Sequence, residues 1–259
     1  LAETLYFDHI TDAVPGTVPA GTCRPYWLRV KVPADAAPGT YRGKVAVTMP
    51  GREAVSLPMT VQVVGWRVPD PDDFQFNVAI EQSPYGVARQ YEGDLWSDEH
   101  LELIAASLDQ LARVGNDWFF VPVLLQTEFG NDEDQPIKWI RRKDGSLRFD
   151  YTNLDKYLDL IVAHCGRPAS PAGGPRVISF VVMHGTATSP IEVMVHDEAS
   201  GKAERVALGG AAADPDIRRR YWAASANDLY RHMAAKGLAE AMHWGYAWDT
   251  EGDPKIKEL

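Results

Sequence analysis

"SDEHLELIAASLDQLARVGNDWFFVPVLL", residues 97–125, is the stretch that decides the fold of the larger part of this chain. Its first part predicts an amphipathic helix, because apolar residues recur every three or four positions, Ser97 is a good N-cap and Gly115 suits the position after the last turn. The run at 118–125 is apolar without interruption, as expected of a strand that is buried on both faces. A helix followed directly by such a strand is typical of an α/β protein.

The same alternation extends in both directions from this stretch. Four strands, expected at 74–82, 118–125, 176–183 and 240–249, alternate with helices at 97–115, 153–166 and 214–237. Such alternation predicts a parallel sheet with right-handed crossovers, either as a doubly wound sheet or as a (β/α)8 barrel of the TIM type. No GxGxxG follows the first strand, which argues against a dinucleotide-binding fold. Because a closed barrel needs eight strands, residues 69–259 would hold about its first half.

The N-terminal part has a different period. Apolar and polar residues alternate over short segments that are separated by Pro/Gly turns, at 26–32, 41–49 and 56–64. This pattern predicts a small β-sandwich over residues 1–68. "WRVPDPDD" (66–73) is typical of a linker, so we expect the domain boundary there, with the partial barrel occupying residues 69–259.

Composition and charge exclude several classes of function. The 259 residues carry a net charge of −10 without a Lys/Arg cluster, which argues against a nucleic-acid partner. No apolar run approaches the ~20 residues of a membrane helix. Cys23 and Cys165 form no CxxC, and HExxH, P-loop and GxSxG motifs are missing, so we expect neither a metal site nor a cofactor. The oligomeric state stays open.

Two insertions interrupt the alternation. Residues 127–150 follow the second strand, and residues 191–208, which predict a hairpin turning near Gly201, follow the third. Both come after the carboxyl ends of strands, which is where parallel α/β folds bind ligands. The alternative is that both are solvent-exposed loops without a role.

Carboxylates cluster at the end of the fourth strand, in "YAWDTEGDP" (246–254). In an extended segment Asp249 and Glu251 share one face and lie roughly 6–7 Å apart. Two such carboxylates repel, so one pKa rises and the other stays low, which separates an acid from an anion as glycosidic cleavage requires. The alternative is an acidic turn that caps a following helix.

Further polar residues end the other strands. Glu81 and Gln82 end the first, Gln126 the second and His184 the third, and each could hydrogen-bond a hydroxyl-rich ligand. Trp248 could form an apolar platform for a sugar ring. The alternatives are turn or capping roles for the polar residues and core packing for the tryptophan.

Three segments together resemble one known family. "RPYWLRVKVPADAAPGTYRGKVAV" (24–47) is similar to the N-terminal β-sandwich of glycoside hydrolase family 123-like proteins from bacteria. Residues 96–117 are similar to the first barrel helix of that group, and residues 221–254 to the helix and strand that deliver its catalytic acids. The resemblance implies a β-sandwich followed by the beginning of a barrel catalytic domain, in an apparently truncated chain.

The resemblance also implies an activity. In family 123 an Asp-Glu pair after the fourth strand cleaves N-acetylgalactosaminides with retention: the Glu protonates the leaving oxygen and the Asp orients the substrate's own acetamido group. Carried over, Glu251 is the general acid and Asp249 the orienting carboxylate, with a carbohydrate substrate and no cofactor. We further expect an extracellular or periplasmic protein, although no leader is visible ahead of Leu1.

This chain departs from the family pattern at one position. Thr250 separates Asp249 from Glu251, so on an extended strand the two carboxylates project to one side, whereas an adjacent pair projects to opposite sides. Three interpretations stay open: a glycosidase for N-acetylhexosamine-containing glycans, a glycosidase with another substrate, and a non-catalytic carbohydrate-binding or scaffold protein that retains the fold.

Overall fold

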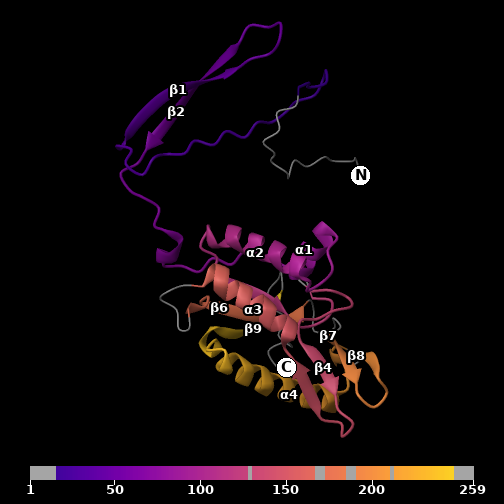
Figure 1. Cartoon of the computed structure of the whole chain (residues 1–259). Coiled ribbons are helices and arrows are strands. Elements are labelled where there is room, and N and C mark those ends of the chain that lie inside the picture. Colours follow the sequence, from indigo (N-terminus) through magenta and orange to yellow (C-terminus); the bar gives the residue numbers. More distant parts are fainter. Residues whose placement is uncertain (1–15, 128–129, 167–172, 185–190, 211–212, 248–259) are drawn as a thin grey trace. The chain divides into compact units, whose positions relative to one another are not determined.

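The computed structural model describes residues 16–127, 130–166, 173–184, 191–210 and 213–247 (Figure 1). The chain forms two compact units, Leu1–Val68 and Pro69–Leu259. Each unit is described by itself below. Among the described residues, no helix has both the length and the apolar character needed to cross a membrane.

The first unit is built on one antiparallel hairpin. Strands β1 (Gly39–Val47) and β2 (Val55–Val63) pair along their whole length. The strand expected at 26–32 is wrong, because that segment pairs with none of the described residues and leaves Trp27 and Leu28 exposed. The described part of this unit therefore holds one two-stranded sheet, and the two stacked sheets of the predicted β-sandwich are not present in it.

The second unit is organised around a parallel sheet. Strands β3 (Trp118–Pro122), β6 (Val177–His184) and β9 (Met242–Ala247) pair in the order β3-β6-β9. The order in space is therefore the order in the chain. Three of the four predicted strands are confirmed: β3 ends three residues earlier than predicted, β6 is shifted by one residue, and β9 begins two residues later. None of the sheets in the described residues closes into a barrel.

The first predicted strand, 74–82, is wrong in extent: it shrinks to one parallel bridge between Val78 and Asn116. Two buried side chains accept hydrogen bonds from backbone N–H groups that a regular strand would pair with a neighbouring strand. Val78 N donates to Asp117 Oδ1 at 2.9 Å, and Ile80 N donates to Asn116 Oδ1 at 2.6 Å. Because these carboxylate and amide oxygens take the backbone N–H groups, the segment lies beside β3 without forming a regular strand with it.

Within the described residues, four α-helices and two short 3-10 helices accompany the strands. Their bounds are α1 Pro84–Tyr91, α2 Asp98–Ala112, α3 Thr152–Cys165, α4 Pro215–Ala235, η1 Pro71–Asp73 and η3 Ala239–Ala241. The predicted caps are confirmed: Ser97 accepts a hydrogen bond from His100 N, and Asp214 accepts two at the start of α4. Helix α1 is an element that the hydrophobic pattern does not predict.

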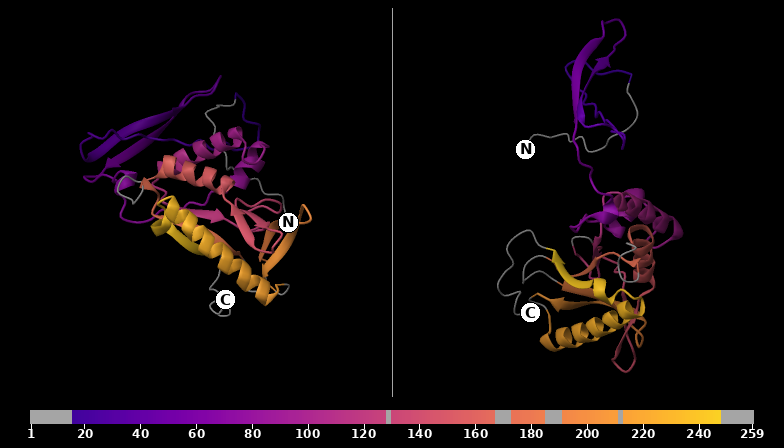
Figure 2. Two further views of the ribbon diagram at one scale, coloured as in Figure 1. Left: turned by 60° about the horizontal axis from the view of Figure 1, so that its bottom comes forward. Right: turned by 90° about the vertical axis from the view of Figure 1, so that its left-hand side faces the viewer.

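The helices cover one face of the parallel sheet. Phe119 and Phe180 point into the main core together with Leu108, Leu158 and Leu229 from the helices. The alternate residues of β3 lie on the other face, where Trp118 and Phe120 stack and Trp118 Nε1 donates to Ser179 Oγ at 2.9 Å. Figures 1 and 2 show α2, α3 and α4 following one another alongside the sheet.

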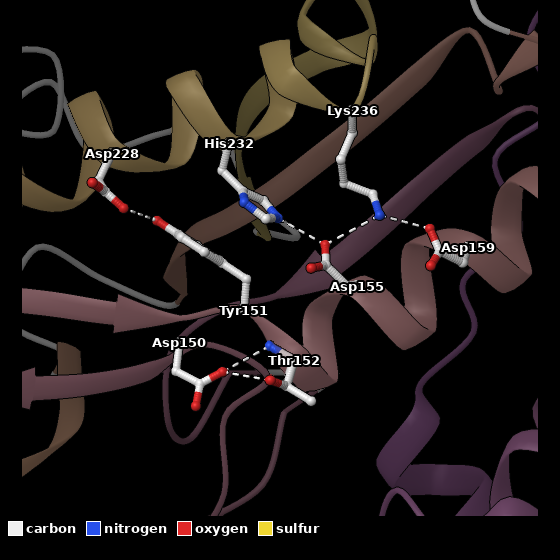
Figure 3. A network of polar contacts seen from close by, with 8 residues as sticks. All are labelled: Asp150, Tyr151, Thr152, Asp155, Asp159, Asp228, His232 and Lys236. Carbon is white, nitrogen blue, oxygen red and sulfur yellow. Dashed lines mark hydrogen bonds and ion pairs between the residues drawn. The ribbon is translucent and has the colours of Figure 1, made fainter.

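A polar network joins α3 to α4 (Figure 3). His232 Nε2 lies 2.7 Å from Asp155 Oδ1, and Lys236 Nζ lies 3.2 Å from the same oxygen. Tyr151, just before α3, stacks on the His232 ring at 4.0 Å and donates to Asp228 Oδ1 at 2.9 Å. These contacts hold α3 and α4 in a fixed position relative to each other.

The two insertions form a single sheet, which we call the insertion sheet. It consists of β4 (Lys138–Arg141), β5 (Leu147–Asp150), β7 (Ile191–Asp197) and β8 (Lys202–Gly209), in the order β5-β4-β7-β8. Each insertion contributes an antiparallel hairpin, and β4 pairs with β7 in parallel. The predicted β7–β8 hairpin is confirmed, and its partnership with the first insertion is a feature that only the structure reveals.

Candidate functional site

The carboxyl ends of β6 and β9 meet at one edge of the parallel sheet. His184, the last residue of β6, pairs with Ala247, the last residue of β9. Neighbouring strands lie about 4.8 Å apart, so the last residues of the two strands lie side by side. The predicted site residues Trp248, Asp249 and Glu251 lie outside the described residues, as does the side chain of His184.

Strand β9 presents its residues to two different faces. Trp244 lies near Phe180, with ring centroids 6.2 Å apart, on the side that faces the helices. A Cβ added at Gly245 would lie 3.2 Å from Ser179 Cβ on the opposite side, a tight contact that Ser179 would have to relieve by a small shift. The predicted outward packing of Trp244 is confirmed, and Gly245 lies on the other face, against Ser179.

The two candidate residues before α1 lie in different environments. Glu81 is exposed. The Gln82 side chain turns toward α3, where its Oε1 accepts a hydrogen bond of 2.7 Å from the Tyr157 hydroxyl. Burial raises the pKa of Tyr157, so the hydroxyl remains a donor at neutral pH. Gln82 Nε2 is buried and has no hydrogen-bond partner among the described residues.

Gln126 lies at a cavity of about 440 Å³ between α1 and the loop that follows β3. The cavity is mostly polar and is lined by Ser83, Tyr85, Gly86, Arg89, Gln126, Thr127, Gly130, Asn131 and Asp132. Gln126 has φ of 55°, a left-handed conformation that costs energy for a residue with a Cβ. Its N–H donates to Asn131 O at 3.1 Å, which closes the loop beneath the cavity.

A buried polar cluster supports this cavity from below. Asp134 Oδ2 accepts hydrogen bonds from the Tyr85 hydroxyl at 3.1 Å and from Trp96 Nε1 at 2.8 Å. His100 accepts from Trp96 N and contacts Pro84 O at 2.8 Å, so both ring nitrogens are engaged. Burial, and secondarily the Asp134 carboxylate, raise the pKa of Tyr85. The cluster fixes the start of α1 against the loop.

The sequence reasoning missed this cavity. One signal was available: Ser83-Pro84 is an N-cap followed by proline at the first helical position, and Ser83 Oγ does accept a hydrogen bond from Gly86 N at 3.0 Å. Asp134 and Asn131 lie in an insertion, where no periodic pattern indicates their position.

A second cavity of about 440 Å³ lies beside strand β9 and has mainly apolar walls. Trp222 of α4 and Trp244 of β9 contribute its aromatic surface, and Arg218 is among its polar residues. Trp244 remains 48% exposed, because β9 is an edge strand in the described residues.

Two kinds of comparison with known proteins point to the same family. The sequence model described as "Glycoside hydrolase 123, catalytic domain" matches residues 82–256, and that of the "Glycoside hydrolase 123 N-terminal domain" matches residues 1–49. A solved structure with a similar fold is a family 123 glycoside hydrolase from Clostridium perfringens, described in connection with glycolipid glycan hydrolysis. The TM-score is 0.67 at 21% identity, over 83% of this chain and 37% of that one. A search of curated proteins found no match.

Proposed function

Because the chain belongs to glycoside hydrolase family 123, we propose that it is a glycoside hydrolase that cleaves O-glycosidic bonds by carboxylate acid/base catalysis. The observation that carries the proposal is that the catalytic-domain match spans residues 82–256 and so includes both Asp249 and Glu251. The meeting of β6 and β9 at His184 and Ala247 supports it further, since the two carboxylates follow β9 directly.

The proposed roles follow from the chemistry of two neighbouring carboxylates. Mutual repulsion keeps one of them protonated, and Glu251 gives its proton to the glycosidic oxygen as the bond from C1 to that oxygen breaks. Asp249 stays ionised and orients the 2-acetamido group, whose oxygen bonds to C1. Water then adds to C1 as the bond from C1 to the acetamido oxygen breaks, and it gives a proton to Glu251, which restores the acid. The substrate class is a glycan that contains N-acetylhexosamine.

The proposed frame for this chemistry is the first half of a (β/α)8 barrel. Its support is the order β3-β6-β9, in which parallel strands follow one another in space as they do in the chain. A doubly wound sheet reverses its strand order and has helices on both faces, whereas here the helical core lies against one face. The chain spans 37% of the length of the solved family 123 structure. The strands that would complete the barrel are therefore proposed and are not observed here.

Two further candidate substrate contacts lie at the carboxyl ends of β3 and β6. Gln126 lines the polar cavity after β3, and His184 ends the strand next to β9, so both suit hydroxyl-rich ligands. Glu81 and Trp248 remain candidates for the same role. Gln82 acts indirectly, through its hydrogen bond with Tyr157. An extracellular or periplasmic location fits a glycan-degrading enzyme.

One observation favours a second candidate function. Thr250 separates Asp249 from Glu251, and a pair with altered spacing can bind a sugar without cleaving it. A non-catalytic carbohydrate-binding or scaffold protein that retains the fold is therefore the alternative.

Replacement of Glu251 by Gln distinguishes these two functions. The full-length gene product should hydrolyse aryl N-acetylhexosaminides, and Glu251→Gln should reduce turnover by about 100-fold or more while sugar affinity is kept, because the amide cannot protonate the leaving oxygen. Glu240→Gln is the matched control, since Glu240 is exposed and precedes β9. Hydrolysis that survives in Glu251→Gln contradicts the assignment, and a parent that binds sugar without hydrolysing it supports the alternative.

A further inference from the structure

The apolar cavity beside β9 lies on the face of the parallel sheet that packs against the helices. Every residue of its lining belongs to β6, β7, β8, α4 or β9, so regular elements enclose it on all sides. Its volume of about 440 Å³ is in the usual range of small-ligand sites. Substrates of parallel α/β folds bind at the carboxyl ends of the strands instead, so this cavity is not part of the proposed glycan site.

Two indole rings give the cavity an apolar surface. Trp222 Nε1 donates to Leu208 O at 3.4 Å, so the N–H is engaged and the ring presents its carbon atoms. Trp244 lines the opposite side and is exposed. The small residues Gly209 and Ala226 leave room between these walls. A sugar would place hydroxyl groups against hydrocarbon here without hydrogen-bond partners, so the walls favour an apolar body.

Two arginines carry the only charges in the lining, which is composed entirely of described residues. Arg218 is half-buried and forms no ion pair with any described residue. Arg219 lies 3.7 Å from Asp216, but both side chains of this pair are largely exposed, so the pair contributes little. Cations near the start of a helix are opposed by its dipole, so the stability of α4 does not account for the two arginines. Their place at an apolar cavity indicates a ligand with a negative charge.

We propose that this cavity binds an amphipathic anion, namely a hydrocarbon chain that ends in a carboxylate, as in a free fatty acid. The chain lies between Trp222 and Trp244, and the carboxylate binds Arg218 and Arg219. A guanidinium holds a carboxylate through two parallel hydrogen bonds, which suits this charged end of the cavity. The volume holds one such chain, so the ligand is a single molecule and not the surface of a bilayer. The inference is independent of the proposed glycosidase function.

The test uses decanoate as the probe and decan-1-ol as its uncharged counterpart. Each is titrated into the full-length gene product and its variants in a calorimeter. Arg218→Gln removes a guanidinium from the cavity. Arg220→Gln is the matched control, because Arg220 is exposed, lies over the Tyr221 ring and does not line the cavity. Ala226→Leu fills part of the cavity without a change of charge.

We expect the parent to bind decanoate more tightly than decan-1-ol, on the order of tenfold, because hydrogen bonds between charged groups add to the burial of the chain. Arg218→Gln should weaken decanoate binding by a similar factor and leave decan-1-ol binding unchanged. Ala226→Leu should weaken the binding of both compounds, and Arg220→Gln should bind both as the parent does.

Several results overturn the proposal. One is a parent that binds no decanoate, and another is equal decanoate affinity in Arg218→Gln and the parent. Equal losses in Arg218→Gln and Arg220→Gln indicate unspecific attraction to α4. Binding to vesicles of phosphatidylcholine and phosphatidylglycerol without binding of decanoate assigns the surface to a bilayer. A parent that binds no decanoate and sediments as a dimer, which Ala226→Leu dissociates, shows that a second copy fills the cavity.

Discussion

The ion pair between Arg141 and Asp197 joins two residues that are far apart in the sequence and adjacent in the insertion sheet. Arg141 Nε lies 2.8 Å from Asp197 Oδ2, and Nη1 lies 2.7 Å from Glu204 Oε1. Asp197 also accepts a hydrogen bond of 2.7 Å from Ser200 N. The hydrogen bond from Arg141, followed by those from Ser200, lowers the pKa of Asp197 to about 2. The charged carboxylate therefore links both insertions.

Replacement of Asp197 by Asn should make stability less dependent on pH. The pKa of Asp197 is lowered from 3.8 to about 2 on folding, so the stabilisation is present above pH 3.8 and is lost as pH falls through about 2. We expect Asp197→Asn to melt below the parent at pH 7 and the difference to vanish near pH 2, in thermal melts across that range. Glu102→Gln, on the exposed side of α2, should show no such trend. A difference that persists unchanged at pH 2 contradicts the prediction.

Helix α4 is the element that leads into β9, and its start is set by a single cap. Asp214 Oδ1 accepts hydrogen bonds from Asp216 N at 2.9 Å and from Ile217 N at 3.0 Å, and Pro215 occupies the first turn. The cap satisfies two backbone N–H groups that otherwise lack partners. A correctly placed helix start therefore fixes where α4 meets the sheet.

Loss of this cap should destabilise the second unit. Asp214→Ala should lower the free energy of unfolding by about 1 kcal/mol, measured by urea denaturation, because two N–H groups lose their acceptor. Asp214→Ser should restore most of the loss, since a serine hydroxyl caps as well. Equal stability of Asp214→Ala and the parent would show that packing alone places the start of α4.

On the scale of the whole molecule, apolar side chains remain exposed in the described part of each unit. The cavity beside β9 exposes Trp244, and β9 has a free edge in the described residues. In the first unit Tyr26, Trp27 and Leu28 are exposed. A parallel edge with an uncovered apolar face favours association with other chains.

Residues 1–259, expressed by themselves, should therefore aggregate or dimerise. Sedimentation velocity should show species larger than a monomer, and Trp244→Lys should reduce them because a charge on an edge strand opposes pairing. Tyr230→Lys, at an exposed position on α4, is the control and should have little effect. A monomer with one sharp cooperative melt contradicts the half-barrel and favours a doubly wound sheet.

Local signals in the sequence were sufficient for most elements. Ser97 and Asp214 mark the starts of α2 and α4 because capping depends only on residues within the next turn. Strands β3 and β6 are visible as apolar runs, since burial on both faces leaves few polar positions. The resemblance to family 123, read from the same residues, is confirmed by the family matches.

Tertiary structure alone decided the rest, because the interactions concerned join residues that are distant in the chain. Asn116 and Asp117 take the backbone N–H groups of the segment around Val78, so a strand-like pattern at 74–82 forms no ladder. Gln135 reaches Met194 across 59 positions and thereby joins two insertions into one sheet. Periodicity reports which face of an element is buried, but the partner that buries it is set by long-range packing and hydrogen bonding.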